Sequence, residues 1–596
     1  MPFPCLPPPP PTLKNKRMTS PKSEPGWFNW KGGFGHGNAN GNHYRHEFNR
    51  RVLKQGRSSS RAHNVMVFLF FFSFILFCYI SYGSGSIHHA TNSNTSVKKL
   101  ILPTSHKPAP PPPPTAAKSL KIPTQIQNST KKSEHLIIHS HSTPFEYPLM
   151  CTNTTNLTCP NNYPTQHTPS NPTHPSTCPD YFRWIHEDLR PWKETGITRE
   201  MVEAAGKKAL FRLVILGGKV YVEKFRKSIQ TRDKFTQWGI LQLLRWYPGR
   251  LPDLELMFDT DDRPVIASKD FRKPNSGPPP LFRYCSDPES LDIVFPDWSY
   301  WGWAETNQRP WRASSREIQE GNKRTKWKDR VPYSYWRGNP TVCPWRQELL
   351  KCNVTNETDW NARLYIQDWL QQIEVGFKES NIADQCTHRY KIYIEGWAWS
   401  VSHKYIMGCD SMTLQIKPKF HEFFSRGMLP TVHYWPIRDN DMCRSLKFAV
   451  EWGNNHTDKA EEIGRAGSRY VHEDMKMEVV YDFMYHLLNE YAKLLRFKPE
   501  IPPKAVELCP ETMACKEGGV WRKFMEEGLE KSPSDRLPCD MPPPYDPQSL
   551  REFVEKRDNL TRQVEMWEDE YWAGFNSKEI KPIDFPPINS NYSNLI

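Results

Sequence analysis

The chain lacks the signatures of several common enzyme classes. It contains no Gly-x-Ser-x-Gly nucleophile turn, no Walker-type phosphate loop and no Gly-x-Gly-x-x-Gly dinucleotide fingerprint. Serine hydrolases, P-loop NTPases and nicotinamide-dependent enzymes are therefore left without positive support. A cysteine-ligated zinc centre is not expected, because no Cys-x-x-Cys pair occurs. Nucleic-acid binding is not expected either, since the net charge of +13 forms no basic stripe with interleaved aromatic residues.

Long apolar runs are equally scarce, and the chain has one, at residues 65–82 (VMVFLFFFSFILFCYISY). Eighteen residues at helical rise span about 27 Å, which suits a thin bilayer core. We expect a single membrane-spanning signal anchor here, and a disordered cytosolic segment at residues 1–64. The positive-inside rule supports this orientation. The basic residues just before the run are Arg45, Arg50, Arg51, Lys54, Arg57 and Arg61.

No N-glycosylation sequon precedes the apolar run, whereas nine follow it. This asymmetry predicts that the C-terminal part is lumenal. The short span, and a C-terminal Ser-Asn-Leu-Ile in place of a KDEL-type signal, favour a type II protein of the Golgi membrane over one of the endoplasmic reticulum. The sequon asparagines are Asn94, Asn128, Asn153, Asn156, Asn353, Asn356, Asn455, Asn559 and Asn591.

Twelve cysteines, from Cys151 to Cys539, follow the apolar run, and an even number in an oxidising lumen predicts disulfides whose pairing the sequence does not give. Composition divides this part of the chain into four. We expect a Pro/Ser/Thr-rich stem at 83–177, an N-terminal acceptor-side lobe at 178–330, a C-terminal donor-binding lobe at 331–500 and a Pro-rich, disulfide-linked tail at 501–596. The sequence does not indicate the oligomeric state.

Strands and helices alternate from residue 210 onward, which predicts an α/β architecture with parallel sheets. A hairpin is expected around Gly217-Gly218. Further strands are expected at 254–258, 332–336, 389–395 and 412–416. Helices are expected at 232–246, 344–352, 402–409, 441–452, 456–472 and 477–495.

Three acidic residues, Asp259, Asp261 and Asp262, directly follow the buried strand at 254–258. Ligands bind at the carboxyl ends of strands in open α/β sheets. Asp259 and Asp261 form an Asp-x-Asp pair that could hold Mn²⁺ or Mg²⁺ on a nucleotide diphosphate. Alternatively, one carboxylate acts as a general base on an acceptor hydroxyl. The third interpretation is an ordinary loop whose acids cap a turn.

Two strand–turn–helix segments are candidate donor sites. In residues 335–346, Arg337 and Arg346 flank a glycine turn and a helix start, an arrangement that favours phosphate; surface arginines on a structural turn are the alternative. In residues 395–404 (EGWAWSVSHK), Gly396 permits close approach of a ligand, and Lys404 supplies positive charge. The tryptophans there, and those of WSYWGW at 298–303, are either sugar platforms or core residues; Trp301, Trp303 and Glu305 are acceptor-side candidates.

Residues 335–352 resemble the strand–Arg-Gly-Ser/Asn–helix segment of the CAP10-like, Rumi-type protein O-glucosyltransferases, glycosyltransferase family 90, and residues 388–414 resemble the most specific block of that family. The resemblance continues through LPTVHYWP at 429–436 and IGRAGS at 463–468, covers about residues 178–495 in order, and looks closest to the plant branch.

The resemblance implies a GT-B fold, with two Rossmann-like domains around a donor cleft. It also implies metal-independent, inverting transfer from a UDP-sugar, without a cofactor. In this pattern Asp262, before Arg263 and Pro264, is the base, and this reading outweighs the one in which Asp259 and Asp261 bind a metal. The donor-site positions are Arg337, Gly338, Asn339, Pro344, Arg346, Gln347, Trp397, Ser400, Ser402 and Lys404.

Two positions depart from the family pattern. Ser402 stands where the UDP-glucose enzymes carry arginine, and Gln347 stands where they carry an acid. We therefore expect Lys404 and Arg337 to contact the diphosphate, with glucose or xylose as the leading donor sugars. The acceptor is expected to be a hydroxyl of a secretory-pathway protein or of a cell-wall glycan. A catalytically silent glycan-binding scaffold with the same fold, and a metal-dependent transferase, are the alternatives.

Overall fold

The computed structural model describes residues 146–151, 158–160, 166–169, 176–272 and 277–576. The predicted membrane span at 65–82, the cytosolic segment and most of the stem lie outside these residues. So do the sequons at Asn94, Asn128, Asn153, Asn156 and Asn591. Within the described ranges, no helix combines the length and the apolar character needed to cross a membrane.

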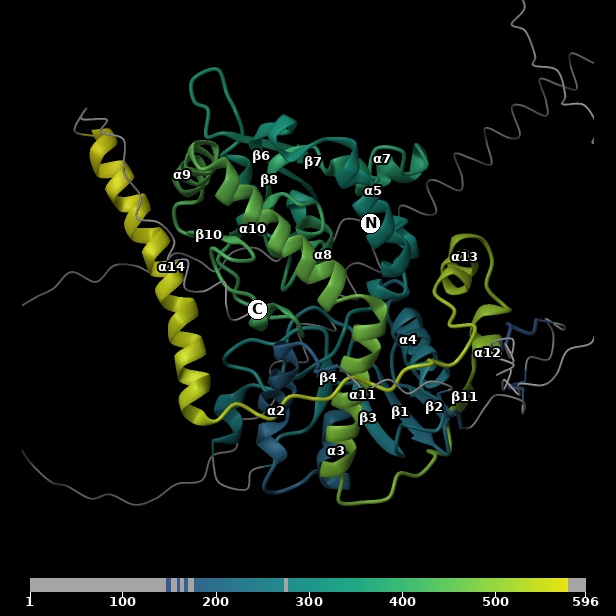
Figure 1. The fold of residues 1–596 in the computed structure, drawn as a ribbon. Coiled ribbons are helices and arrows are strands. Elements are labelled where there is room, and N and C mark those ends of the chain that lie inside the picture. The colour runs from purple at the N-terminus through teal and green to yellow at the C-terminus, as the bar shows by residue number, and fades with distance from the viewer. Residues whose placement is uncertain (1–145, 152–157, 161–165, 170–175, 273–276, 577–596) are drawn as a thin grey trace, which may run out of the picture. The chain divides into compact units, whose positions relative to one another are not determined.

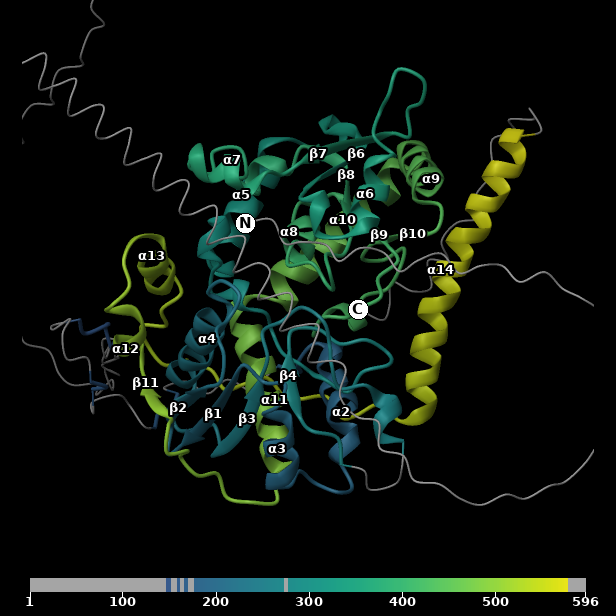
Figure 2. The same cartoon turned by 180° about the vertical axis from the view of Figure 1, so that it is seen from behind.

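The strands form two sheets, seen from opposite sides in Figures 1 and 2. The first has the order β11-β2-β1-β3-β4-β5 and the second the order β10-β9-β8-β6-β7. The strands of the first sheet are β1 (Phe211–Leu216), β2 (Lys219–Lys224), β3 (Leu254–Phe258), β4 (Leu281–Arg283), β5 (Ile293–Val294) and β11 (Val506–Leu508). Those of the second are β6 (Val331–Gly338), β7 (Ala362–Ile366), β8 (His388–Tyr393), β9 (Met412–Ile416) and β10 (Trp435–Ile437).

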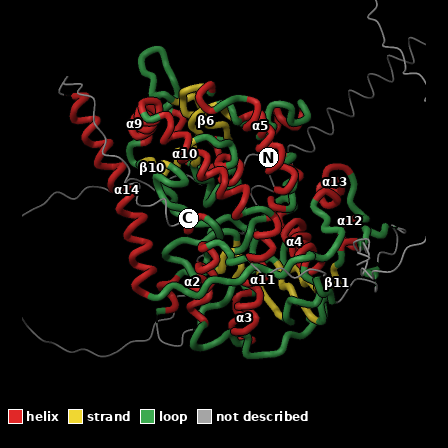
Figure 3. Tube along the Cα trace, viewed as in Figure 1, coloured by secondary structure: helices red, strands yellow, loops and turns green. Residues whose placement is uncertain are grey.

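Helices surround both sheets, as the tube in Figure 3 shows. The helices before β6 are α2 (Trp184–Leu189), α3 (Arg199–Ala205), α4 (Arg232–Trp246) and α5 (Trp311–Arg324). Those from β6 to β10 are α6 (Pro344–Leu350), α7 (Trp369–Glu374) and α8 (His403–Met407). Later come α9 (Met442–Asn455), α10 (Thr457–Arg469), α11 (Met477–Leu494), α12 (Pro510–Ala514), α13 (Gly519–Glu527) and α14 (Pro547–Asn576).

The predicted elements are present, with boundaries that shift by a few residues. Helix α4 and strands β3 and β9 match the predicted ranges. The helix expected at 456–472 ends at Arg469 and continues as a π-turn over Tyr470–Asp474. The hairpin forms because Gly217 and Gly218 have φ angles of 58° and 76°, a backbone region that suits glycine.

Every strand pair of the second sheet is parallel, as expected from the alternating pattern. The first sheet is mixed: only the β3–β4 and β4–β5 pairs are parallel, while β1, β2, β3 and β11 pair antiparallel. The expectation of parallel sheets is therefore wrong for three of the five strand pairs of the first sheet. The Gly217-Gly218 hairpin reverses the chain between β1 and β2, and β3 and β11 add antiparallel to these two strands. The fold is α/β with two sheets, a layout compatible with a GT-B-like arrangement.

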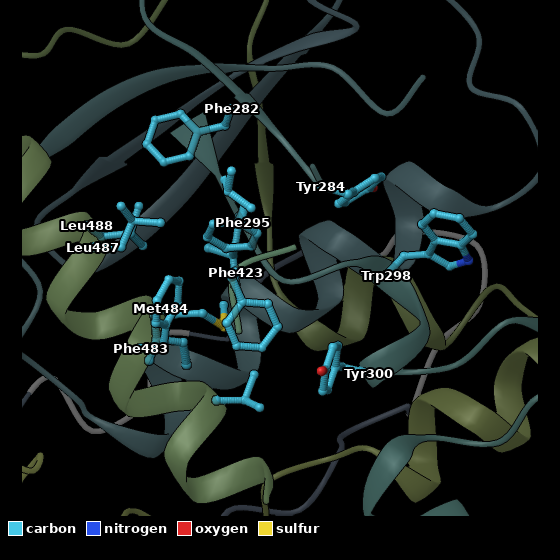
Figure 4. Close-up of a cluster of buried hydrophobic side chains, with 14 of the residues drawn as sticks. Phe282, Tyr284, Phe295, Trp298, Tyr300, Phe423, Phe483, Met484, Leu487 and Leu488 are labelled. Atoms are coloured by element: carbon cyan, nitrogen blue, oxygen red, sulfur yellow. The ribbon is translucent and has the colours of Figure 1, made fainter. Parts of the chain in front are cut away.

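Two apolar clusters form the core. The larger lies on the first sheet and includes residues of α11, which packs against α2, α4 and β3. Figure 4 shows part of it, with Tyr284 and Trp298 on one side and Phe483 of α11 on the other. The smaller cluster lies between the second sheet and helices α9, α10 and α14. We call the parts of the chain built on the first and second sheets the first and second lobes.

Helix α14 contacts both lobes (Figure 1). Near its start, Phe553 packs edge-on against Trp184 of α2, with ring centroids 6.3 Å apart. About four turns later, Trp567 lies 6.3 Å from Trp435 of β10. The ion pair between Arg438 and Asp569, at 2.7 Å, adds a polar contact with the second lobe.

Ten of the twelve cysteines after the apolar run form five disulfides: Cys151–Cys515, Cys159–Cys509, Cys178–Cys539, Cys352–Cys443 and Cys386–Cys409. Disulfide formation is thus confirmed, but the expectation drawn from the even count is wrong for Cys285 and Cys343, which lie outside the disulfides and are buried. The first three bonds join the end of the stem to the tail, across separations of at least 350 residues.

Candidate active site

The acidic loop that follows β3 is matched by arginines. Asp259 is 1% exposed, and its two carboxylate oxygens form ion pairs with Arg226 and Arg283. Asp261 pairs with the same Arg226 at 3.1 Å. Burial lowers the pKa of the Arg283 guanidinium to about 10, although the neighbouring Asp292 works against this shift. Neither oxygen of Asp259 is left available to a cation.

Metal-ligating groups converge elsewhere in the described part of the chain, at Cys178, His486 and Cys539. The two cysteines of this cluster are joined to each other in a disulfide, so they offer no thiolate.

Asp262 pairs with a different arginine from the other two acids of the loop. Its Oδ1 accepts a hydrogen bond of 2.8 Å from Nη1 of Arg232, the first residue of α4. Its Oδ2 has no hydrogen-bond partner among the described residues, and the side chain is 33% exposed. Asp262 therefore presents one carboxylate oxygen that can accept a proton from a bound molecule.

The Asp262 loop touches the loop that follows β8 in the second lobe. Arg263 donates from Nε to the backbone oxygen of Trp397 at 3.0 Å, and its guanidinium lies 4.0 Å above the Trp397 ring. Trp397 in turn stacks on Trp345 of α6, with centroids 6.3 Å apart. On the inner side, the Cys285 thiol donates to the backbone oxygen of Asp262 at 3.2 Å. The predicted base and the 395–400 segment are thus brought together.

The second-lobe part of the site lies where the strand order reverses. The chain passes from β6 to β7 on one side and from β8 to β10 on the other, so the carboxyl ends of β6 and β8 form a topological switch point. We call the space beyond these two strand ends the crevice; the segments that begin at Arg337 and Glu395 lie at these ends, where the sequence predicts the donor.

Arg346 does not present a free guanidinium to this crevice. It is buried, and it donates to the backbone oxygens of Glu395 at 2.9 Å, Asn339 at 3.2 Å and Ile394 at 3.2 Å, and to Oγ of Ser400 at 3.1 Å. Burial lowers the pKa of its guanidinium. The expected bidentate contact with phosphate is not available to Arg346, which joins the loop after β6 to the loop after β8.

Lys404 also makes internal contacts instead of facing the crevice. Its ammonium group is 2% exposed, donates to Oγ of Ser299 at 2.6 Å and lies 3.4 Å from a carboxylate oxygen of Asp297. Burial lowers the pKa of this amine. Lys404 therefore links α8 to the first lobe and is not positioned to meet a diphosphate, contrary to the sequence expectation.

Arg337 is the predicted cation that stays at the crevice surface, with its side chain 21% exposed. Its Nε donates to Gln367 at 2.6 Å, and its Nη2 lies 3.4 Å from Glu379. Gly338 and Asn339 follow it at the rim, where Oδ1 of Asn339 accepts from the backbone nitrogen of Thr341. Pro344 and Gln347 of α6 are exposed.

Two serine hydroxyls lie on the other side of the crevice. Oγ of Ser400 is 2.8 Å from Oγ of Ser402, and the backbone nitrogen of Ser400 donates to the Tyr393 hydroxyl at 3.3 Å. Arg346 also donates to Ser400. This pair of hydroxyls can bind a phosphate or sugar oxygen without positive charge.

The acceptor-side candidates separate into two groups. Trp301 is fully buried in the core, with its indole nitrogen 3.3 Å from the Tyr481 hydroxyl, so it is not a sugar platform. Trp303 and Glu305 are partly exposed and lie beside the start of α4, where they contact Gln230 and Thr231. Trp303 also packs edge-on against Trp298, the ring below the Arg232 guanidinium, with centroids 5.2 Å apart.

A cavity of about 1030 Å³ lies on the α14 side of these loops. It is lined by residues after β9 and β10, by the 286–292 segment of the first lobe and by α14. Neither Asp262 nor Ser400 belongs to its lining, so the predicted base and the predicted donor-site serine lie outside this cavity.

Sequence reasoning missed Arg232, Arg263 and Lys419. The signal for Arg232 was a basic residue at the start of a predicted helix, where the helix dipole disfavours it. Arg263 stood inside the motif but received no role. Lys419, whose ammonium is 5.6 Å from the Trp345 ring, follows a strand end that was not examined for ligands.

Comparison with known proteins identifies the group to which this site belongs. Residues 173–568 match the family described as Glycosyl transferase family 90. The O-glucosyltransferase rumi of Drosophila melanogaster is 24% identical over 355 residues, covering 56% of this chain and 83% of the fly protein. Protein O-glucosyltransferase 1 of Homo sapiens is 25% identical over 333 residues, covering 54% of this chain and 81% of the human protein. With the family match extending over most of the described residues, the chain belongs to glycosyltransferase family 90.

Proposed function

We propose that this protein transfers a sugar, glucose or xylose, from a UDP-sugar to a hydroxyl group with inversion at the anomeric carbon, using a GT-B arrangement of its two lobes. The observation that carries the proposal is Asp262. Its carboxylate keeps one oxygen open at the carboxyl end of β3, and its loop contacts the segment at the switch point of the second sheet.

In the proposed reaction, Oδ2 of Asp262 takes the proton of the acceptor hydroxyl. The acceptor oxygen forms a bond to the anomeric carbon as the bond from that carbon to the β-phosphate oxygen breaks. UDP leaves with the electron pair of the broken bond. Arg337 and the hydroxyls of Ser400 and Ser402 stabilise the developing negative charge on the diphosphate.

The proposed transfer does not use a divalent cation. Support comes from the arginines that occupy both oxygens of Asp259 and one of Asp261, because an Asp-x-Asp site needs those oxygens as ligands. Positive charge at the diphosphate comes from Arg337 instead, and Lys419 near Trp345 is a second source.

We further propose that the acceptor is a protein of the secretory pathway and that the enzyme resides in the Golgi membrane with its lobes in the lumen. The relatives described above are O-glucosyltransferases, and the human one is named as acting on protein. The five disulfides are consistent with an oxidising compartment. A hydroxyl of a cell-wall glycan is the alternative acceptor, to be tested in the same assay.

The test is a UDP-release assay of the full-length protein against a panel of UDP-sugars and acceptors, with and without EDTA. We expect release with UDP-glucose or UDP-xylose, a change of less than about twofold with EDTA, and a loss of about 10²–10⁴-fold in Asp262→Asn. Asp261→Asn is the matched control, because it neutralises the neighbouring acid. Full activity in folded Asp262→Asn would remove the base from the mechanism.

One observation favours a second candidate, a glycan-binding scaffold without catalysis. Arg346 and Lys404, two of the three predicted cations, are used for internal contacts. Saturable UDP binding by isothermal titration separates the two functions, since the enzyme requires it and the scaffold does not.

A further inference from the structure

The base proposed above has a neighbour whose position is unusual. Arg232 is the first residue of α4, a 15-residue helix, and it is buried. A cation at a helix N-terminus opposes the helix dipole, which costs typically about 0.3–1 kcal/mol. Its Nε is also buried without a hydrogen-bond partner in the described part of the protein. These two costs indicate that the residue has a role that outweighs them.

The hydrogen bonds of Arg232 converge on the base loop. Its Nη1 donates both to Oδ1 of Asp262, at 2.8 Å, and to the backbone oxygen of Thr260, at 3.0 Å. One nitrogen thus fixes the carboxylate relative to the backbone two residues before it. Because Oδ1 is held on the α4 side, Oδ2 is the oxygen left for the acceptor.

The guanidinium is itself held from the other side. Its central carbon lies 4.4 Å above the ring of Trp298, in the range of a cation–π contact. Trp298 is 1% exposed and packs against Tyr284, Trp303 and Trp399, with centroids 5.2 Å, 5.2 Å and 6.2 Å away. Figure 4 shows Trp298 beside Tyr284. The Trp298 indole therefore holds the guanidinium of Arg232, and this guanidinium holds the carboxylate of Asp262.

We infer that Arg232 is a positioning residue for the transfer reaction, which holds Asp262 with its Oδ2 directed at the acceptor and which Trp298 keeps in place. This inference rests on the proposed function, because it requires Asp262 to be the base. Arg232 acts through Asp262 and touches neither sugar nor diphosphate. Its removal therefore affects the chemical step and leaves the binding of the donor unchanged.

The test compares the steady-state kinetics of Arg232→Met and Arg232→Lys with those of the wild-type protein, on the donor that the UDP-release assay selects. A misplaced catalytic group costs about 10²-fold in rate. We expect kcat to fall by about that factor in Arg232→Met, with the donor KM changed by less than twofold. Arg232→Lys should recover about tenfold of the loss, since lysine restores a charged donor. Unchanged kcat in Arg232→Met, or an equal change in donor KM, overturns the inference.

A double-mutant cycle separates positioning from a general structural effect. If Arg232 acts only through Asp262, the pair Asp262→Asn and Arg232→Met is no slower than Asp262→Asn alone. Additive losses contradict the inference while leaving Asp262 as the base; full activity in Asp262→Asn refutes the proposed function instead. Trp298→Phe gives a second route if Arg232→Met does not fold. It keeps an aromatic ring, and we expect a three- to tenfold fall in kcat; no change counts against the role of the indole.

Arg226→Met is the matched control. Arg226 pairs with Asp259 and Asp261 of the same loop but makes no contact with Asp262. Its loss should leave kcat within about threefold of the wild-type value. A loss as large as that of Arg232→Met would show that any arginine paired with this loop is equally required, which overturns a specific role for Arg232.

Discussion

The two lobes use their charged residues in opposite ways at the candidate active site. In the first lobe, three carboxylates are matched by arginines, and Asp261 and Asp262 each keep one oxygen without an arginine partner. In the second lobe, the cations Arg346 and Lys404 both form internal contacts. The crevice is bordered by the hydroxyls of Ser400 and Ser402 and by Arg337. The difference shows that a charged motif residue is available to a ligand only when its hydrogen-bonding capacity is not already used.

The largest expected effect tests the structural role of Arg346. In Arg346→Met, the backbone oxygens of Asn339, Ile394 and Glu395 and the hydroxyl of Ser400 each lose one donor. We expect the free energy of unfolding to fall by about 3 kcal/mol or more, since hydrogen bonds to charged groups contribute about 1.5–3 kcal/mol each. Urea unfolding with the disulfides intact measures it. The control, Gln347→Met on the exposed face of α6, should stay within about 0.5 kcal/mol. Equal stability of the two variants would mean that Arg346 is not required for these internal contacts and is available to bind the donor.

Glu395 is a buried second-lobe acid whose effect on stability depends on pH. Its carboxylate accepts from the backbone nitrogens of Lys419 and Phe420 and so joins two second-lobe loops. Burial raises its pKa from 4.5 to about 7. The folded state thus holds a proton that the unfolded chain releases, and this contribution to stability is greatest below pH 4.5 and is lost as the pH rises to 7.

Glu395→Gln should remove that pH dependence, because glutamine stays uncharged. At pH 8 we expect it to be more stable than the wild-type protein by up to about 3 kcal/mol, while near pH 4.5 the two should be similar. The measurement is urea unfolding of both proteins across this pH range. Parallel curves for the two would mean that Glu395 does not titrate in this window.

A smaller effect is expected for Arg337, the cation left at the crevice surface. Arg337→Met should leave the unfolding free energy within about 1 kcal/mol, but raise the KM for the UDP-sugar by about tenfold, the equivalent of about 1.4 kcal/mol. Competition with free UDP provides an independent measure of the affinity. Donor KM unchanged in Arg337→Met, with intact folding, would exclude Arg337 from the diphosphate site.

The smallest effect concerns Asn353, a sequon asparagine of the second lobe whose side chain makes internal hydrogen bonds. Its side-chain amide accepts from the backbone nitrogen of Leu364 at 3.0 Å and donates to the oxygen of the same residue at 3.2 Å, which covers the outer edge of β7. The donated hydrogen is the one cis to Oδ1, and in an N-linked glycan this hydrogen is replaced by the sugar. We therefore expect glycopeptide mapping to find the glycan on the exposed Asn356 and not on Asn353.

The secondary structure and the order of the site segments could be predicted from the sequence because they depend on local patterns. Strand β3, the glycine hairpin and α4 lie where alternation and turn residues place them. The fate of each cation could not be predicted, since it depends on partners far along the chain: Lys404 pairs with Asp297, 107 residues earlier. The position of Arg263 over Trp397, 134 residues away, depends in the same way on how the lobes meet.

Disulfide pairing illustrates the same limit. The cysteine count predicted bonds, but the pairs that join the stem to the tail span 350 to 364 residues, and nothing local marks them. Cys285 also shows why counting fails. Burial raises the pKa of its thiol, and the thiol is used to hold the Asp262 backbone. An even number of cysteines can thus include a thiol that serves as a small buried hydrogen-bond donor.

The three bonds between stem and tail, Cys151–Cys515, Cys159–Cys509 and Cys178–Cys539, have a consequence for how the molecule comes apart. They close a covalent ring that contains every residue of both sheets. A protease that nicks the backbone once inside this ring releases no fragment. Such a clipped molecule keeps its full mass on a gel until a reductant is added, and only then separates into two pieces.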